Sequence, residues 1–234
     1  MAAAQTVPGA PVADGVGWIS AGFVNIYAVR AGDETYLIDT GVARRARRVV
    51  RAFRKSSVPL SRVTRVLLTH HHPDHRGGAA YLLEATRAPL ACHAGDAPFV
   101  DGRLRAPMPL LMRLILRTRP APVATVLNDG DRVGPFEVVH VPGHTPGEVA
   151  FFDRQRRLLV SGDSVVEHEG RLALPSSRFS ADMGQAIRSL DRLRGLDAEV
   201  LLPGHGVPVL TNVSALLEHL IRRARTDHPL GPPV

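Results

Sequence analysis

The chain has 234 residues, of which 44% are hydrophobic and 5% aromatic, so it is long enough for one well-buried domain with a core of aliphatic side chains and alanine. Its 29 basic and 22 acidic residues give a net charge of +7. The arginine-rich runs lie in helix-like patterns without interleaved aromatic residues, which favours solvated helix faces over a nucleic-acid-binding surface.

Strands and helices alternate in the first half of the chain. Small residues with Pro and Gly predict a flexible lead-in over residues 1–16. Apolar runs between turn signals then predict strands, and patterns with a helical period predict helices. The strands are expected at 17–20, 23–30, 35–39, 63–68 and 89–93, and the helices at 42–55 and 77–86.

Residues 95–123 interrupt this alternation. Several prolines surround the apolar and basic stretch LLMRLILRTR (110–119), which predicts a short helix on an inserted, lid-like segment. Three roles stay open for it: covering a pocket, touching a membrane surface, or packing on its own domain.

The second half of the chain repeats the alternation. Strands are expected at 124–127, 136–141, 148–153, 158–161 and 199–202, helices at 181–193 and 212–226, and a frayed tail at 227–234. Two halves of this kind predict an α/β fold. Two mixed β-sheets would pack face to face with helices outside, in a single domain over residues 17–226.

The stretch THHHPDHRGG (69–78) places four histidines and an aspartate within six positions, directly after a predicted buried strand. His70 and His72 are two positions apart, so in an extended segment both point the same way. Pro73 stiffens the loop. If His70 and His72 bind one metal ion, Asp74 and His75 can turn toward a second one. His71 points away and is interpreted either as support behind the ligands or as a structural residue.

Three later turns carry further side chains that bind metals. VPGHTPG, VSGDS and LPGHG hold His144, Asp163 and His205, and each turn follows a predicted buried strand and is stiffened by Gly or Pro. Imidazole nitrogen and carboxylate oxygen suit zinc, manganese or iron(II). Seven such groups exceed what one tetrahedral ion needs. They favour two divalent ions that share a bridging carboxylate and a bridging water or hydroxide.

These motifs resemble the metallo-β-lactamase-fold hydrolase superfamily, in its glyoxalase II and lactonase-like branch. The family's signature motif H-x-H-x-D-H corresponds to residues 70–75, and the resemblance covers roughly residues 17–210. It implies the four-layer αβ/βα sandwich, with the site at one edge. It implies one ion on His70, His72 and His144, another on Asp74, His75 and His205, and Asp163 as the bridge. LIDTG (37–41) matches the family's strand-end aspartate, so Asp39 is expected to support the ligands from behind.

The expected function is a dinuclear metal-dependent hydrolase. Its cofactors would be two divalent ions, with Zn²⁺ preferred over Fe or Mn. A metal-bridging hydroxide would cleave an ester-like bond of a small molecule (a thioester, lactone or ester), and Asp74 would also accept the proton of the attacking water. Two alternatives stay open: an enzyme resembling the mononuclear iron persulfide dioxygenases, and a nuclease or phosphodiesterase, which the positive charge would suit.

The remaining expectations concern substrate contacts, partners and location. His168, on the loop after Asp163, and Arg178 and Phe179, ahead of a helix, are candidates for substrate contact. The partner would be a small-molecule substrate, without nucleic acid, and a homodimer is an open option. Cys92, the single cysteine, excludes an internal disulfide. No secretory signal and no apolar run of about 18 residues is present, so a cytoplasmic protein without a membrane span is expected.

Overall fold

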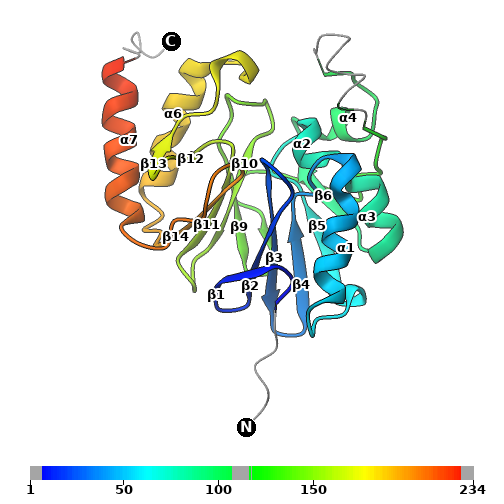
Figure 1. Cartoon of the computed structure of the whole chain (residues 1–234). Coiled ribbons are helices and arrows are strands. Elements are labelled where there is room, and N and C mark those ends of the chain that lie inside the picture. Colours follow the sequence, from blue (N-terminus) through cyan, green and yellow to red (C-terminus); the bar gives the residue numbers. More distant parts are fainter. Residues whose placement is uncertain (1–6, 107–115, 117, 228–234) are drawn as a thin grey trace. The chain divides into compact units, whose positions relative to one another are not determined.

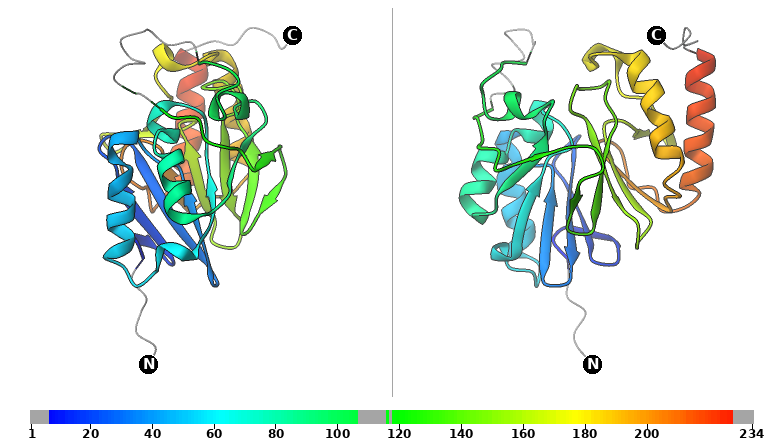
Figure 2. Two further views of the ribbon diagram at one scale, coloured as in Figure 1. Left: turned by 90° about the vertical axis from the view of Figure 1, so that its right-hand side faces the viewer. Right: turned by 180° about the vertical axis from the view of Figure 1, so that it is seen from behind.

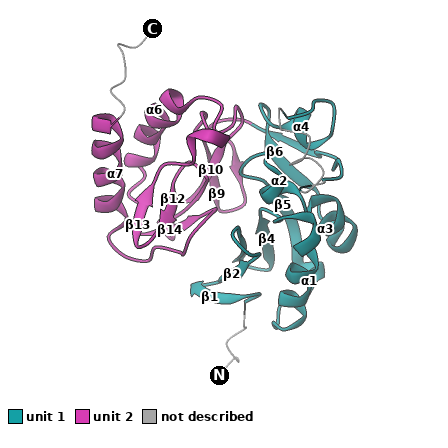
Figure 3. Cartoon of the chain, turned by 45° about the horizontal axis from the view of Figure 1, so that its top comes forward, with its two compact units in different colours: residues 1–127 teal, residues 128–234 magenta. Residues whose placement is uncertain are grey.

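The computed structural model describes residues 7–106, 116 and 118–227. The chain forms two compact units, residues 1–127 and 128–234, which Figure 3 draws in teal and magenta. Among the described residues, no helix combines the length and the apolar character that crossing a membrane requires.

The described part of the first unit contains one mixed sheet of seven strands (Figure 1). Its order is β1 to β7 along the chain: Ala10–Ala13, Val16–Ser20, Asn25–Ala31, Glu34–Ile38, Val63–Leu67, Leu90–His93 and Thr125–Leu127. The first four strands pair antiparallel, and β4 to β7 pair parallel. Because β4 and β5 are parallel neighbours, with Ile38 opposite Leu67, the residues that follow them meet at one edge of the sheet.

Helices of the first unit pack against its sheet and complete its hydrophobic core. Among the described residues they are η1 (Ala43–Arg45), α1 (Ala46–Arg54), η2 (Leu60–Arg62), α2 (Pro73–Arg76), α3 (Ala79–Thr86) and α4 (Ala97–Val100). Figure 1 shows α1 and α3 along one face of the sheet. There Val49 and Phe53 of α1 and Leu82 of α3 are buried in a cluster with strand residues such as Val66.

The second unit repeats the plan with a five-stranded sheet, in the order β14-β11-β10-β9-β8. The strands are β8 (Arg132–Val133), β9 (Phe136–His140), β10 (Val149–Asp153), β11 (Leu158–Gly162) and β14 (Val200–Pro203). A small hairpin, β12 (Val166–His168) and β13 (Arg171–Ala173), stands beside it. The remaining elements are η3 (Ser177–Phe179), α6 (Met183–Arg194) and α7 (Val213–Asp227).

The second core lies between this sheet and its two long helices. Leu190 of α6 and Leu220 of α7 are buried in one cluster with Phe152 and Leu159 of the sheet, and Figure 2 shows the two helices side by side in both views. The strands β11 and β14 run parallel, with Gly162 opposite Pro203. The turns that follow these strands therefore lie together, which brings Asp163 next to His205.

The structure confirms most of the predicted elements and corrects several details. Residues 10–13 and 16, predicted as lead-in, belong to strands, because Gly15 turns the chain at φ 68° and lets β1 pair with β2. Asp227, predicted as the start of the tail, ends α7. The short elements β8, β12, β13, α2 and α4 were not expected, since two to four residues carry too little periodicity.

The helix expected within 110–119 lies outside the described residues, apart from residues 116, 118 and 119. The lid-like character of 95–123 and the single domain over 17–226 therefore stay predictions. So does the frayed tail beyond residue 227.

Candidate metal centre

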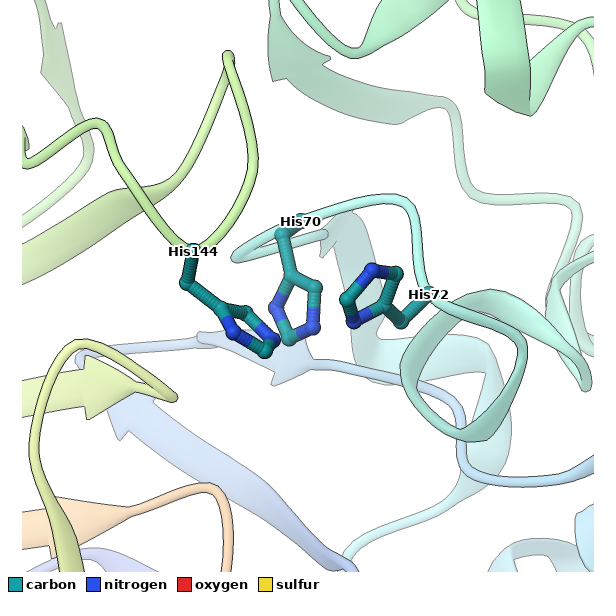
Figure 4. Close-up of side chains that lie close together, drawn as sticks. All are labelled: His70, His72 and His144. Carbon is teal, nitrogen blue, oxygen red and sulfur yellow. The ribbon is translucent and has the colours of Figure 1, made fainter. Parts of the chain in front are cut away.

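The histidine loop leaves β5 and runs into α2. His70 and His75 are fully buried, whereas His72 is half-buried. The rings of His70 and His72 lie 4.8 Å apart between centroids and nearly perpendicular at 79° (Figure 4). The ring of His75 lies 4.1 Å from that of His70. Asp74 Oδ2 is 3.8 Å from His75 Nε2. Four of the seven candidate ligands therefore gather on this loop within the first unit.

Asp39 stands behind this loop, at the end of β4. Its carboxylate accepts hydrogen bonds from the backbone N–H of Thr69 at 2.9 Å and from the Thr69 hydroxyl at 2.9 Å. Its Oδ2 also lies 2.8 Å from His75 Nδ1. Because a carboxylate only accepts, His75 Nδ1 donates to Asp39, and in the neutral ring this leaves the lone pair on Nε2. Asp39 therefore contacts the histidine loop at Thr69 and His75, and its role in supporting metal ligands stays a prediction.

The same logic fixes the tautomer of His70. Its Nδ1 lies 3.0 Å from Thr69 Oγ1, whose hydroxyl already donates to Asp39. The hydroxyl therefore accepts, and His70 Nδ1 donates. The lone pair of His70 Nε2 is left to point away from Thr69.

His71 does not point to solvent but into a buried network that the sequence did not reveal. Its backbone N–H donates to Asp96 Oδ2 at 2.7 Å, and its Nδ1 lies 3.0 Å from the same oxygen. Its ring stacks on Phe99 at 4.3 Å between centroids. Arg76 Nε donates to the His71 carbonyl at 2.8 Å. Burial lowers the pKa of the Arg76 guanidinium, and the charge of Asp96 opposes this.

Through these contacts Asp96 holds the histidine loop at His71. It is fully buried and comes from the turn between β6 and α4, about twenty residues downstream of the loop. Only one signal in the sequence could have drawn attention to it: an acidic residue just after a buried strand, in HAGDAP (93–98). That signal alone does not name its partner.

In the second unit, Asp163 lies between two of the candidate histidines. Its Oδ2 is 3.4 Å from His144 Nε2 and 3.2 Å from His205 Nε2. The turn is held by a second buried carboxylate, since the backbone N–H of Asp163 donates to Glu148 Oε1 at 2.8 Å. Sequence analysis missed Glu148, which is fully buried directly before β10. The three candidate ligands of this unit thus form one cluster.

The His144 turn is fixed by the segment that leads into α6. His144 Nδ1 lies 2.9 Å from Ser180 Oγ, and the Ser180 hydroxyl donates to the Ser176 carbonyl at 2.9 Å. Ser180 therefore accepts from His144, which again leaves Nε2 bare. Gly143 has φ 137°, and a Cβ there would meet the backbone nitrogen of Ala186 at 2.1 Å. Only glycine permits this close approach of turn and helix.

Glu167 of β12 holds the His205 turn. Its Oε2 accepts from the backbone N–H of Val207 at 2.7 Å, and its own N–H donates to the His205 carbonyl at 3.0 Å. Gly206 lies between these contacts at φ +91°, and a Cβ there would meet the Glu167 carbonyl oxygen at 2.2 Å. The position of His205 therefore depends on residue 206 being glycine, which has no Cβ.

We expect Gly206→Ala to weaken metal binding by about tenfold or more, because the new methyl group must push the His205 turn away from Glu167. Gly170→Ala is a matched control. Gly170 also has a left-handed φ of +79°, so it carries the same backbone strain, but nothing lies within 4 Å of its would-be Cβ. Metal affinity measured by competition with a chromogenic chelator checks this. Equal affinities in the two variants would contradict the role given to Gly206.

The three candidates for substrate contact are all exposed. His168 lies at the end of β12 rather than on a loop, and Arg178 and Phe179 lie in η3. The Arg178 guanidinium stands 6.0 Å from the centre of the Phe179 ring. The described contacts do not join any of the three to the Asp163 cluster, so substrate contact stays a prediction for them.

Cys92 is a structural residue of β6. It is fully buried, and burial raises the pKa of its thiol to about 12. A thiol that remains protonated at neutral pH is a poor nucleophile and a poor metal ligand.

Comparison with known proteins identifies the family of this chain. The family model described as "Metallo-beta-lactamase superfamily" matches residues 19–205. The chain belongs to the metallo-β-lactamase superfamily, and the αβ/βα fold class predicted from its motifs is confirmed. Its membership of a superfamily of metal-dependent hydrolases is confirmed with it.

Three similar proteins illustrate the range of this family. The chain is 28% identical over 200 residues to "Probable metallo-hydrolase YybB" of Bacillus subtilis, covering 85% of this chain and 88% of the relative. It is 30% identical over 223 residues to "Acyl-coenzyme A thioesterase MBLAC2" of Bos taurus, covering 82% and 78%. Among solved structures, TTHA1623 in a di-iron-bound form is similar with a TM-score of 0.65 and 32% identity, covering 82% and 92%.

Proposed function

We propose that the chain is a dinuclear metal-dependent hydrolase, in which the histidine loop and the Asp163 cluster together hold two divalent ions. The proposed ligand triads are His70, His72 and His144 for one ion, and Asp74, His75 and His205 for the other, with Asp163 between them. Figure 4 draws the three histidines of the first triad. Zn²⁺ is the proposed metal. The imidazole and carboxylate donors also accept iron and manganese.

The observation that carries this proposal is the shared tautomer of three histidines. His70, His75 and His144 each donate from Nδ1 to an oxygen that cannot donate in return: those of Thr69, Asp39 and Ser180. In the neutral ring, each of the three therefore has its lone pair on Nε2, where it can bind a metal ion. Hydrogen bonding of the remote imidazole nitrogen is the usual arrangement behind a metal-binding histidine, because it fixes the ring and raises its basicity.

Asp163 adds a second argument within its own cluster. Asp163 Oδ2 lies 3.4 Å from His144 Nε2, and this contact is favourable when a proton or a metal cation lies between the two atoms. The other histidine of the cluster, His205, is equally close at 3.2 Å. A carboxylate between two imidazoles fits the role of a bridge between two cations.

Two bound ions would activate a water molecule and polarise the carbonyl of the substrate. The chain's own groups would supply orientation and proton transfer. Asp74 is the proposed proton acceptor, because its side chain is 18% exposed whereas His75 beside it is fully buried. An acceptor that still reaches solvent can pass the proton on.

For the substrate we propose a thioester of a small molecule, ahead of lactones and simple esters. The support is the similarity to an acyl-coenzyme A thioesterase over most of both chains. A short-chain acyl-coenzyme A is therefore the first substrate to assay.

Metal content tests the proposal. Protein purified without added metal is analysed by elemental mass spectrometry and assayed with acyl-coenzyme A, lactones and aryl esters. We expect close to two zinc ions per chain and thioester hydrolysis that a chelator abolishes. A single iron with oxygen consumption on persulfides would replace the proposal with a dioxygenase. Metal-dependent cleavage of nucleic acid, with none of the ester-like substrates turned over, would replace it with a nuclease.

A further inference from the structure

The stretch from His70 to His72 joins two proposed ligands of one ion without belonging to a helix or a strand, since it lies between β5 and α2. Asp74 and His75, two proposed ligands of the other ion, lie inside α2. There the His75 N–H donates to the His72 carbonyl at 3.0 Å. Helical backbone geometry thus holds the second pair of ligands, while the backbone of the first pair needs partners from elsewhere in the chain.

Side chains supply these partners at His71, the residue between the two ligands. Its N–H donates to Asp96 Oδ2 at 2.7 Å, and its carbonyl accepts from Arg76 Nε at 2.8 Å. The N–H belongs to the planar peptide group shared with His70, and the carbonyl belongs to the one shared with His72. Both peptide groups that join the ligands are therefore held from outside the loop.

Asp96 is itself held by its backbone and is suited to a strong hydrogen bond. Its N–H donates to the His93 carbonyl at 3.0 Å, and its carbonyl accepts from the Phe99 N–H of α4 at 3.0 Å. Its side chain is fully buried. Burial lowers the pKa of the Arg76 guanidinium, and the negative charge of Asp96 opposes this. A hydrogen bond to an ionised acceptor is roughly twice as strong as one between neutral groups, so the charge of Asp96 strengthens its hold on His71.

Asp39 supports the candidate site differently, because it reaches ligands of both proposed ions. It accepts from the Thr69 N–H and lies 2.8 Å from His75 Nδ1. Thr69 Oγ1 in turn lies 3.0 Å from His70 Nδ1. Loss of Asp39 therefore disturbs ligands of both ions. Asp96 instead holds the loop between two ligands of the same ion.

We infer that Asp96 is a positioning residue for one of the two proposed ions, the ion of His70, His72 and His144. The inference rests on the dinuclear centre proposed above. It assigns a role to the start of the segment 95–123, which sets how tightly one ion is held without contributing a ligand. The two ions then respond unequally when Asp96 is changed, which a general loss of stability would not produce.

Asp96→Asn tests this with Co²⁺, whose visible absorption reports on the ligands of each bound ion. The change keeps the size of the side chain but removes the charge that lies beside His71 and Arg76. Metal-free protein is titrated with Co²⁺, and competition with a chromogenic chelator gives the affinity of each ion. We expect one ion to bind about tenfold or more weakly than in the wild type, and the other to stay within about threefold of it.

The absorption spectrum identifies which ion is weakened. At one Co²⁺ per chain, we expect Asp96→Asn to show the spectrum of His72→Ala, which loses a ligand of the same ion. The spectrum of Asp74→Ala, which loses a ligand of the other ion, is expected to differ. Asp101→Asn is the matched control, because it removes a negative charge from the same segment, where Asp101 pairs with Arg103 at 2.8 Å. We expect wild-type affinities from it.

If far-UV circular dichroism shows that Asp96→Asn does not fold, Arg76→Gln takes its place, because Arg76 Nε holds the other peptide group of His71. Equal weakening of both ions, or of neither, in the folded variant overturns the inference and leaves the dinuclear centre intact. A spectrum that matches Asp74→Ala also overturns it. Wild-type protein that binds no more than one Co²⁺ refutes the dinuclear proposal itself, and the inference falls with it.

Discussion

Asp163→Ala is expected to lower kcat/KM for thioester hydrolysis by about 1,000-fold or more, equivalent to about 4 kcal/mol of transition-state stabilisation. Asp163 Oδ2 is the atom that approaches both His144 and His205, so its loss removes the proposed bridge and leaves each ion only its own three ligands. Bound metal should fall from two ions per chain toward one. Elemental analysis and steady-state kinetics measure the two effects on the same preparation.

The variant should keep its fold, because the turn is held through the backbone. The Asp163 N–H still donates to Glu148 Oε1 after the side chain is removed. Asp33→Ala provides the control, since it deletes a carboxylate that is 94% exposed and lies 3.6 Å from Arg62 on the surface. We expect wild-type kinetics from it. Activity retained by Asp163→Ala at the wild-type level would refute the proposed dinuclear mechanism.

Asp39→Asn is expected to weaken metal binding by about 10–100-fold while the protein stays folded. The new amide can offer only one accepting oxygen to Thr69 and His75, which both now donate to the carboxylate. His75 then loses either its fixed orientation or its fixed tautomer. Chelator competition measures the affinity, and thermal unfolding with and without metal measures how much stabilisation the bound ions still give.

Asparagine is the informative replacement because of the backbone at this position. Asp39 has φ 61°, a left-handed conformation that Asn adopts far more readily than Ala does. Asp39→Ala would add backbone strain of about 1–2 kcal/mol and confuse the two effects. Asp33→Asn, at a side chain that is 94% exposed, controls for the loss of one negative charge. If Asp39→Asn bound metal as tightly as Asp33→Asn, Asp39 would have only a folding role.

The sequence predicted the regular elements well, because their patterns are local. The buried strand 149–153 begins with the continuous apolar run VAFF, and α6 and α7 show a helical period. The histidine loop and the three later turns were also visible, since each is a short motif at a strand end. Short elements such as β12 and β13 were missed, because three residues cannot show a period.

The hydrogen bonds that hold the candidate-ligand turns in place could not be predicted from the sequence. Asp96, Glu148 and Glu167 have no local pattern that distinguishes them from surface acids, yet each is buried against the backbone of a candidate-ligand turn. Their partners lie 15 to 40 residues away, and only the packing of separate loops brings them together.

The sequence by itself determined the family, the order of strands and helices, and the kinds of donor atom, because these depend on residue type and spacing along the chain. The tertiary structure decided the tautomers of His70, His75 and His144 and the anchoring of His71. The physical reason is that such a hydrogen bond is set by which distant segments pack together, and it carries no signal within its own segment.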